Sequence, residues 1–284
     1  MLTYTLANGL EIPAIGFGMW QNTNDEEVKS SLKHAIDAGY RLIDGAAAYQ
    51  NEEAIGQALK ELPISREELF LTSKLRNAAH GYENVKREVA ESLNKLQTDY
   101  LDLYLIHWPV VKGHGDNWQK DNLGTWRAME ELYEEGILKA IGVSNFSVEH
   151  LENLVNHARI KPMVNQLLIH PGVTQTETRN YCKKHTILLQ AYSPLKPLSV
   201  IMEDAKMKRM KEKYQKSVAQ ILLRFSIDLG IIPLTKSVHE ERIKGNIDVF
   251  DFKLEEEDMD YLLAWSHPDF TEPDNKNERP PQVS

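Results

Sequence analysis

The chain has 284 residues, a formal net charge of −9 at pH 7, 42% hydrophobic residues and 26% charged residues. This acidic balance argues against a surface for nucleic acid or for an anionic membrane, although it leaves room for a local basic pocket. The composition is that of an ordinary globular enzyme, and no apolar stretch reaches the roughly 20 residues that span a bilayer. We therefore expect a small-molecule partner, with no nucleic acid and no membrane.

The single cysteine, Cys182, cannot form a disulfide within the chain, and the first residues show no basic segment followed by an apolar run. A cytoplasmic location is therefore expected. Two lysines follow Cys182 on an expected helix and would favour a reactive thiolate. A helical cysteine outside any cleft motif is more often a packing residue, so no role is assigned to it.

The predicted elements begin with a hairpin. Asn8-Gly9 separates two short apolar runs within Tyr4–Pro13, which is a strong hairpin signal and is interpreted as a cap on the floor of a barrel. Eight runs of strand character follow, at Ala14–Gly18, Arg41–Asp44, Phe70–Lys74, Leu101–His107, Ala140–Ser144, Pro162–Gln166, Ile187–Tyr192 and Ile231–Leu234.

Helical patterns separate these runs. Apolar residues recur at helical spacing in the segments Val28–Ile36, Glu52–Lys60, Val85–Leu96, Leu123–Glu135, Leu151–Leu154, Asp204–Tyr214 and Glu240–Val249. Gly136 stops the fourth of them, where a left-handed residue is needed. Capping boxes at Thr174–Glu177 and Ser217–Gln220 are expected to open two further helices.

Eight strand–helix units predict a closed (β/α)8 TIM barrel, an α/β fold that typically uses about 250 residues as one domain. We therefore expect one domain over residues 1–284, with the hairpin cap and extra helices. A doubly wound open sheet would place a G-x-G-x-x-G turn after its first strand, whereas no third glycine follows Gly16-Phe-Gly18. The polar, Pro-rich tail from His267 to Ser284 is expected to be irregular.

Four titratable residues fall at the carboxyl ends of three consecutive strands: Asp44, Tyr49, Lys74 and His107. Alone, each has an ordinary interpretation as a helix-capping carboxylate, a rim aromatic, a solvent-facing charge or a satisfied core histidine. Lys74 and His107 close largely apolar runs, however, where a charge or an imidazole is costly without a partner. Their convergence on one rim predicts a catalytic site.

Several motifs in register resemble the aldo-keto reductase superfamily from about Leu10 to Phe252. They are Gly39-Tyr-Arg-Leu-Ile-Asp44 with Glu52 and Gly56, Tyr49-Gln-Asn-Glu52, Thr72-Ser-Lys74, Asp99-Tyr-Leu-Asp-Leu-Tyr-Leu-Ile-His-Trp-Pro109, Ile141-Gly-Val-Ser-Asn-Phe146, Asn165-Gln166, Ala191-Tyr-Ser-Pro-Leu195, and Lys236-Ser-Val238 with Arg242 and Asn246. The short loop after Tyr192 is more similar to microbial members, such as diketogluconate and methylglyoxal reductases, than to vertebrate steroid-handling ones.

The resemblance implies NADPH-dependent reduction of aldehydes or ketones to alcohols. A carbonyl that accepts hydride from nicotinamide C4 develops negative charge on oxygen, so it needs a proton donor and a positive field. Tyr49 is implied as the general acid, with Lys74 lowering its pKa and Asp44 keeping Lys74 charged and oriented. His107 is implied to hydrogen-bond the substrate carbonyl and to fix its angle to the nicotinamide.

The resemblance also implies the residues that bind NADPH. Ser144, Asn145 and Gln166 would bind the nicotinamide carboxamide, Tyr192 would stack on its ring, and Ser193 and Leu195 would line the pyrophosphate loop. Lys236, Ser237, Val238 and Arg242 would surround the adenosine 2′-phosphate, with Asn246 toward the adenine. Outside this motif, Lys236 and Arg242 are more often solvated charges. Within it, two cations and a hydroxyl suit a dianionic phosphate, so NADPH is favoured over NADH.

Substrate contacts are expected from Trp20 and Trp108, which follow the first strand and His107 and would form an aromatic mouth; each is otherwise an ordinary core or rim aromatic. Arg76 stands where the family often has tryptophan, two positions after Lys74. It would give the pocket a cationic wall and favour an acidic or polyol substrate, unless it points to solvent.

Two alternatives remain open. A metal-dependent barrel hydrolase would use Asp44, His107 and His170, but the sequence has no His-x-His or comparable cluster, and no metal site is predicted. A non-catalytic NADP-binding module that senses cofactor state would bind NADPH without turnover. The family-based expectation is a monomer.

Overall fold

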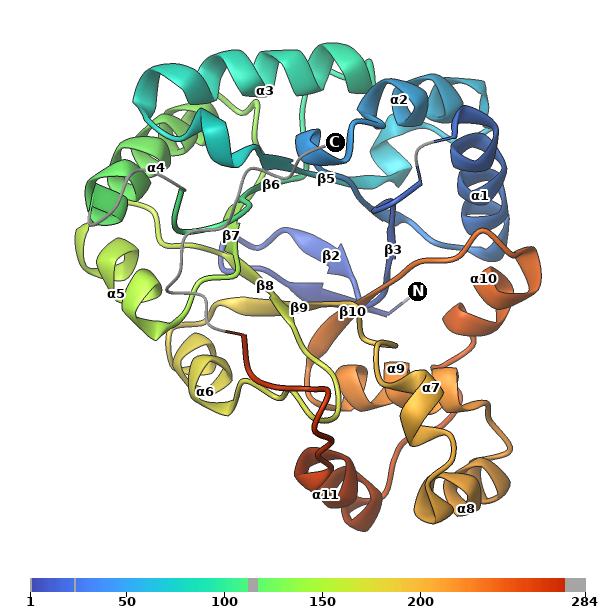
Figure 1. The fold of residues 1–284 in the computed structure, drawn as a ribbon. Coiled ribbons are helices and arrows are strands. Elements are labelled where there is room, and N and C mark those ends of the chain that lie inside the picture. Colours follow the sequence, from blue (N-terminus) through green and yellow to red (C-terminus); the bar gives the residue numbers. More distant parts are fainter. Residues whose placement is uncertain (1, 23, 112–116, 274–284) are drawn as a thin grey trace.

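Eight parallel strands close into a barrel in the order β10-β3-β4-β5-β6-β7-β8-β9 (Figure 1). The computed structural model describes residues 2–22, 24–111 and 117–273. The barrel strands are β3 Gly16–Gly18, β4 Leu42–Asp44, β5 Phe70–Leu75, β6 Leu103–Ile106, β7 Ile141–Ser144, β8 Val164–Leu168, β9 Leu188–Tyr192 and β10 Ile231–Thr235. Because β10 pairs with β3, the barrel is confirmed and the open sheet is excluded.

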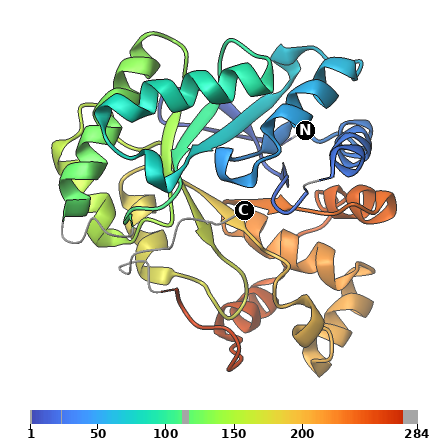
Figure 2. The same cartoon turned by 45° about the horizontal axis from the view of Figure 1, so that its top comes forward.

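Helices form a ring around the strands (Figure 1). Their bounds are α1 Asp25–Ala38, α2 Glu52–Glu61, α3 Tyr82–Leu96, α4 Trp118–Glu134, α5 Val148–His157, α6 Thr176–Lys184, α7 Leu198–Ile201, α8 Ala205–Tyr214, α9 Val218–Asp228, α10 Glu240–Ile247 and α11 Glu256–Ala264. In Figures 1 and 2, α7, α8 and α11 lie outside the ring, on the side of the barrel where α9 lies. These are the expected extra helices, and their apolar residues form a core cluster with α9.

The predicted hairpin closes the amino end of the barrel. Its strands, β1 Thr3–Thr5 and β2 Glu11–Pro13, pair antiparallel. Leu6 and Ile12 are buried in one cluster with Leu42, Leu103 and other residues near the starts of the barrel strands. The hairpin therefore fills the floor, and the open end of the barrel is the one at the carboxyl ends of the strands.

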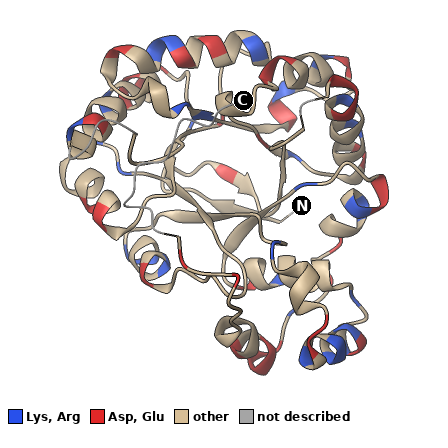
Figure 3. Cartoon of the chain, in the orientation of Figure 1, with Lys and Arg blue, Asp and Glu red and all other residues tan. Residues whose placement is uncertain are grey.

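A second apolar layer lies between the strands and the helices. Lysine, arginine, aspartate and glutamate are spread over the outer helices, with both signs interspersed (Figure 3). Among the described residues, no helix combines the length and the apolar character needed to cross a membrane.

Some predicted boundaries are wrong. The strand expected over Leu101–His107 is limited to β6, and Leu101 makes only an isolated bridge to Leu138. Helix α4 begins at Trp118, five residues before the expected start. Its predicted end is confirmed, since Gly136 follows the helix with φ at +75°.

The two predicted capping boxes have different outcomes. Ser217 and Gln220 form the expected reciprocal bonds at the start of α9. At α6 the N-cap is Gln175, a left-handed residue without a side-chain cap, and the Thr174 hydroxyl pairs with that of Thr176. The Gln175 N–H instead donates to Glu272, a residue of the C-terminal segment that local sequence could not identify. The irregular tail expected from His267 is confirmed as far as residue 273, and its remainder lies outside the described residues.

Candidate active site

A cavity of about 630 Å³ opens at the carboxyl ends of the barrel strands. Asp44, Tyr49 and His107 line it, together with residues at or just after the carboxyl ends of β3, β7, β8, β9 and β10. Lys74 lies directly behind this wall and is fully buried. The structure thus brings the four titratable residues together at one end of the barrel.

Lys74 is the centre of this group. Its Nζ donates to Asp44 Oδ2 at 2.7 Å, to the Gly45 carbonyl oxygen at 2.8 Å and to Tyr49 Oη at 3.3 Å. An ammonium with no solvent exposure needs such partners, because an unpaired buried charge is costly. Burial lowers the pKa of Lys74, but Asp44 and Tyr49 outweigh this effect and raise it, so the amine stays protonated.

The chain after β4 explains how Tyr49 reaches Lys74. Asp44 pairs with Gly18 on one side and Thr72 on the other, so it ends its strand at the rim. A short 3-10 helix, Ala47–Tyr49, follows directly, and Gln50 is left-handed with φ at +57°. This tight path turns the phenol of Tyr49 back over the strand ends, where it lines the cavity.

The phenol of Tyr49 remains protonated at neutral pH. Burial raises the pKa of Tyr49, the charge of Lys74 opposes this rise, and the charge of Asp44 adds to it. The expected direction of the Lys74 effect therefore agrees with the structure, although burial outweighs it. A protonated phenol next to an ammonium is a proton donor whose conjugate base is stabilised in place.

His107 faces Tyr49 across the cavity. Its ring centroid lies 5.8 Å from that of Tyr49 in an edge-on arrangement. Burial, aided by the charge of Lys74, lowers the pKa of His107 to about 3. The imidazole is therefore neutral at physiological pH and offers one N–H as a hydrogen-bond donor without supplying a proton.

A second set of polar side chains supports Asp44 from the opposite wall. Gln166 Nε2 donates to Asp44 Oδ1 at 2.8 Å and to Gln190 Oε1 at 2.9 Å. Both carboxylate oxygens of Asp44 are thus hydrogen-bonded, one to Lys74 and one to Gln166. Gln190 was not predicted as a site residue, because it lies inside β9 and belongs to none of the motifs that carry the family resemblance.

Asn145 connects the ends of three strands. Its Nδ2 donates to the His107 carbonyl oxygen at 2.9 Å, and its Oδ1 accepts from Tyr192 Oη at 2.9 Å. Ser144 Oγ donates to the Gln166 carbonyl oxygen at 2.9 Å. Asn145 is left-handed, with φ at +63°, which turns its amide into the barrel mouth. These bonds fix the rim where the nicotinamide contacts were expected.

The other expected cofactor residues divide into two groups. Ser193, Leu195 and Lys236 line the cavity together with Ser144, Asn145, Gln166 and Tyr192. The lining does not include Ser237, Val238, Arg242 and Asn246, which lie in the loop after β10 and on α10. Within the part of the chain that the structure describes, neither Lys236 nor Arg242 has an ion-pair partner. Both cations are thus available to an anion.

The predicted substrate residues also have different positions. Trp20 and Trp108 line the cavity, and Trp20 is half exposed at its mouth. Arg76 does not line it, because β5 ends at Leu75 and the guanidinium turns outward onto α3. There it pairs with Glu88 at 2.8 Å and Glu91 at 2.9 Å. The expected cationic wall at Arg76 is therefore wrong. The lining includes Lys196 instead, which sequence analysis missed.

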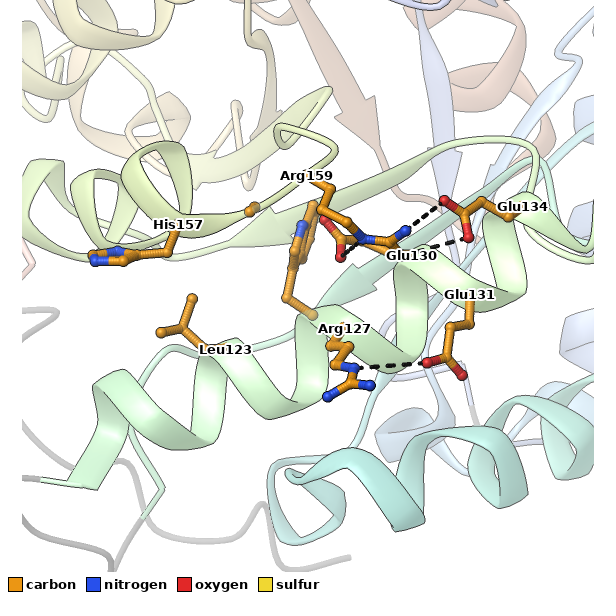
Figure 4. A pocket seen from close by; sticks show the side chains of 9 residues that line it. Leu123, Arg127, Glu130, Glu131, Glu134, His157 and Arg159 are labelled. Carbon is orange, nitrogen blue, oxygen red and sulfur yellow. Dashed lines mark hydrogen bonds and ion pairs between the residues drawn. The ribbon is translucent and has the colours of Figure 1, made fainter.

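A hollow of about 580 Å³ lies on the outside of the ring, between α4 and the end of α5 (Figure 4). Its charged side chains pair with one another: Arg159 with Glu130 and Glu134, and Arg127 with Glu131. It faces no strand end, and its charges are already compensated, so we assign it no catalytic role.

The structure also bears on the hydrolase alternative. In residues 2–22, 24–111 and 117–273, no three His, Cys, Asp or Glu side chains are grouped to ligate a metal ion. His170 is buried away from the cavity, with Nδ1 2.8 Å from the Pro171 carbonyl oxygen.

Cys182 is fully buried, and burial raises the pKa of its thiol to about 12, as befits a packing residue.

Comparisons with known proteins agree with this geometry. The Aldo/keto reductase family model matches residues 14–266. Glyoxal reductase of Bacillus subtilis is 48% identical over 262 residues, which cover 92% of each chain. Methylglyoxal reductase DkgA of Escherichia coli is 40% identical over 255 residues, covering 89% of this chain and 90% of that protein.

Solved structures give the same result. An aldo-keto reductase of Bombyx mori in complex with NADP matches with a TM-score of 0.89 and 36% identity, over 99% of this chain and 98% of that chain. An aldo/keto reductase of Brucella melitensis matches with a TM-score of 0.86 and 43% identity, over 92% and 98% of the two chains. The chain belongs to the aldo/keto reductase family.

Proposed function

We propose that this protein reduces aldehydes or ketones to alcohols with NADPH, with Tyr49 as the general acid. The observation that best supports this function is the bonding of Lys74 Nζ, buried behind the cavity wall, to both Asp44 and Tyr49, which line the cavity with His107. Family membership supports the same chemistry. Bound NADPH supplies the hydride that reduces the carbonyl carbon.

The protein's own groups handle the carbonyl oxygen. The neutral imidazole of His107 donates a hydrogen bond to that oxygen and orients it. Tyr49 Oη then gives its proton to the oxygen as negative charge develops there, which completes the alcohol. The phenolate left on Tyr49 is stabilised by Lys74, 3.3 Å away, until solvent returns the proton. Asp44 keeps Lys74 charged and fixed both while Tyr49 is a phenol and while it is a phenolate.

The residues present fit a nicotinamide dinucleotide with a 2′-phosphate. Ser144, Asn145 and Gln166 place hydroxyl and amide groups at one wall, and the ring of Tyr192 lies beside them. Ser193 and Leu195 continue this wall toward Lys236. Lys236 and Arg242, which have no ion-pair partner among the residues that the structure describes, suit a phosphate dianion better than a neutral ribose, with Ser237, Val238 and Asn246 between and beyond them. This donor set favours NADPH over NADH.

We further propose small carbonyl compounds as substrates. Two relatives are named glyoxal reductase and methylglyoxal reductase, and small dicarbonyls of that kind fit a cavity of about 630 Å³ that also has to admit the cofactor. Trp20 and Trp108 supply the aromatic walls of the mouth. We also propose that residues 1–284 act as a single domain, as a monomer and in the cytoplasm.

The experiment that tests the function is the loss of NADPH absorbance with a panel of carbonyls: methylglyoxal, an aromatic aldehyde, a keto ester and a diketo sugar acid. Tyr49→Phe should lower kcat by at least about 100-fold, since it removes the proton donor, while NADPH binding persists. Tyr133→Phe, which removes a phenol remote from the cavity, serves as the matched control.

A folded wild-type protein that binds NADPH but turns over no carbonyl would contradict the reductase function. That result would favour the cofactor-sensing module. Equal turnover by the wild type and Tyr49→Phe would contradict only the role of Tyr49 as general acid and would leave the reductase function standing.

A further inference from the structure

A buried carboxylate lies behind β5, outside the barrel. Glu52 is 3% exposed, and its Oε1 and Oε2 accept hydrogen bonds from Ser73 Oγ at 2.6 Å and from Ser92 Oγ at 3.2 Å. Burial raises the pKa of Glu52, and the two hydroxyls and the charges of Lys95 and Arg76 oppose this rise. The layer around it is otherwise largely apolar, so burying a carboxyl group at this position costs free energy of folding.

The bond to Ser73 joins the two elements that present the catalytic pair. Glu52 is the first residue of α2 and follows Tyr49 by three positions. Ser73 immediately precedes Lys74 in β5. Successive residues of a strand face opposite sides, so the side chain of Lys74 enters the barrel while that of Ser73 faces α2 and α3. One hydrogen bond thus spans from the Tyr49 segment to the Lys74 strand.

Other contacts make the start of α2 a rigid unit. Asn51 Nδ2 donates to the carbonyl oxygens of Met19 and Asn22, at 2.8 Å each. One turn into the helix, a Cβ at Gly56 would lie 2.8 Å from Leu96 Cα, so α2 and α3 are in backbone contact there. A shift of the first turn of α2 would therefore be transmitted through the short link to Tyr49.

We propose that Glu52 is a positioning residue for the reductase reaction. Its carboxylate ties the segment that presents Tyr49 to the strand that presents Lys74, and thereby sets the distance between the phenol and the ammonium. This inference rests on the reductase function proposed above.

The chemistry of a carboxylate suits this task. Its two acceptor oxygens receive two serine hydroxyls at once, in directions that an apolar side chain could not define. Removing it would take away the acceptor to which Ser73 Oγ and Ser92 Oγ donate, inside a largely apolar layer. An apolar residue would pack there, but it would not fix the register of α2 against β5.

The test compares Glu52→Ala, Glu52→Gln and Ser73→Ala with the wild type. Glu53→Gln is the matched control, because it changes the neighbouring, exposed carboxylate of the same helix turn. The measurements are kcat, KM for NADPH, the primary isotope effect with deuterated NADPH, NADPH affinity by fluorescence, and the Lys74 Nζ to Tyr49 Oη distance in crystal structures of the variants.

Glu52→Ala is expected to lower kcat by about 10- to 100-fold, because a displacement near 1 Å at the reacting groups has effects of this size. The isotope effect should rise, and the Lys74–Tyr49 distance should exceed 3.3 Å. KM for NADPH and its affinity should stay within about twofold of the wild type, because the phosphate contacts are remote. Glu52→Gln, which keeps an acceptor for Ser73, should recover most of kcat, and Ser73→Ala should show the same pattern as Glu52→Ala in weaker form.

A folded Glu52→Ala variant with wild-type kcat would overturn the proposal, as would a loss of kcat that merely follows a loss of folded protein. If Glu52→Ala does not fold, wild-type kcat in Ser73→Ala overturns it. If kcat of Glu52→Gln is as low as that of Glu52→Ala, the effect comes from the negative charge of Glu52, and its role as a positioning residue is also overturned. Turnover by the wild type in the same assay separates each of these outcomes from a failure of the proposed function.

Discussion

Lys74 Nζ donates a hydrogen bond to Tyr49 Oη at 3.3 Å while its stronger contact, at 2.7 Å, goes to Asp44 Oδ2. The ammonium is therefore held mainly by the carboxylate and only loosely by the phenol. This leaves the phenol free to transfer its proton, and the bond to Lys74 can shorten when phenolate forms.

Lys74→Met should destabilise the protein as well as inactivate it. The substitution leaves Asp44 buried without its cation, and breaking one side of a buried pair costs about 3–5 kcal/mol. The double variant Lys74→Met with Asp44→Leu should recover much of this stability without recovering activity. Urea unfolding followed by circular dichroism measures the difference, and equal stability of the two variants would contradict the paired burial.

The rate of reduction should depend little on pH from about pH 6 to about pH 9. Reduction needs protonated Tyr49, so the rate falls only as pH rises through the pKa of Tyr49, which burial raises above its usual value. His107 does not titrate in this range, because burial and Lys74 lower its pKa to about 3. Profiles of kcat/KM for the wild type and His107→Gln provide the measurement. An acidic limb near pH 6.5 that disappears in His107→Gln would show instead that the imidazole is charged in the working enzyme.

His107 should also make the fold sensitive to acid. Its pKa is about 3 in the folded protein, while the unfolded chain keeps the usual value near 6.5, so the unfolded state binds the proton first. The free energy of unfolding therefore decreases as pH falls from about 6.5 toward 3. Above about pH 6.5 the imidazole is neutral in both states, so this loss of stability does not occur. In His107→Gln, the free energy of unfolding should fall less steeply over the same range. Parallel slopes for the two proteins would count against a neutral buried imidazole.

The preference for NADPH should depend on Lys236 and Arg242. Replacing either cation with methionine should raise the dissociation constant for NADPH by about tenfold, because each removes a charged hydrogen-bond donor, and should leave NADH almost unaffected. Lys244→Met, which removes an exposed cation of α10, the helix that carries Arg242, is the control. Fluorescence titration with both cofactors is the measurement. A parallel loss of NADH binding would place the two residues away from the 2′-phosphate.

The sequence predicts the barrel and the catalytic group because both follow from strand ends. Asp44, Lys74 and His107 close apolar runs, and parallel strands bring such residues to one rim whatever the helices do. The direction of Arg76 could not be predicted in this way. It stands only two positions after Lys74, yet two acidic residues of α3, Glu88 and Glu91, draw it to the outer side of the sheet.

Long-range partners limited the other predictions. The Thr174–Glu177 pattern has the letters of a capping box, but a carboxylate almost a hundred residues later, Glu272, takes the first N–H of the turn. Gln190 likewise carries no local signal, because its role depends on Gln166 in the adjacent strand β8. Such contacts arise from the closed fold and not from spacing along the chain.

The hairpin on the barrel floor determines the end of the barrel at which ligands enter and leave. Because Leu6 and Ile12 seal the amino end, the described part of the chain offers a dinucleotide and a carbonyl compound the same entrance, at the carboxyl ends of the strands. Two ligands that use one entrance are released in the reverse of the order in which they bind. The ligand seated deepest therefore enters first and departs last, so the closed floor of the barrel imposes an order on binding and release.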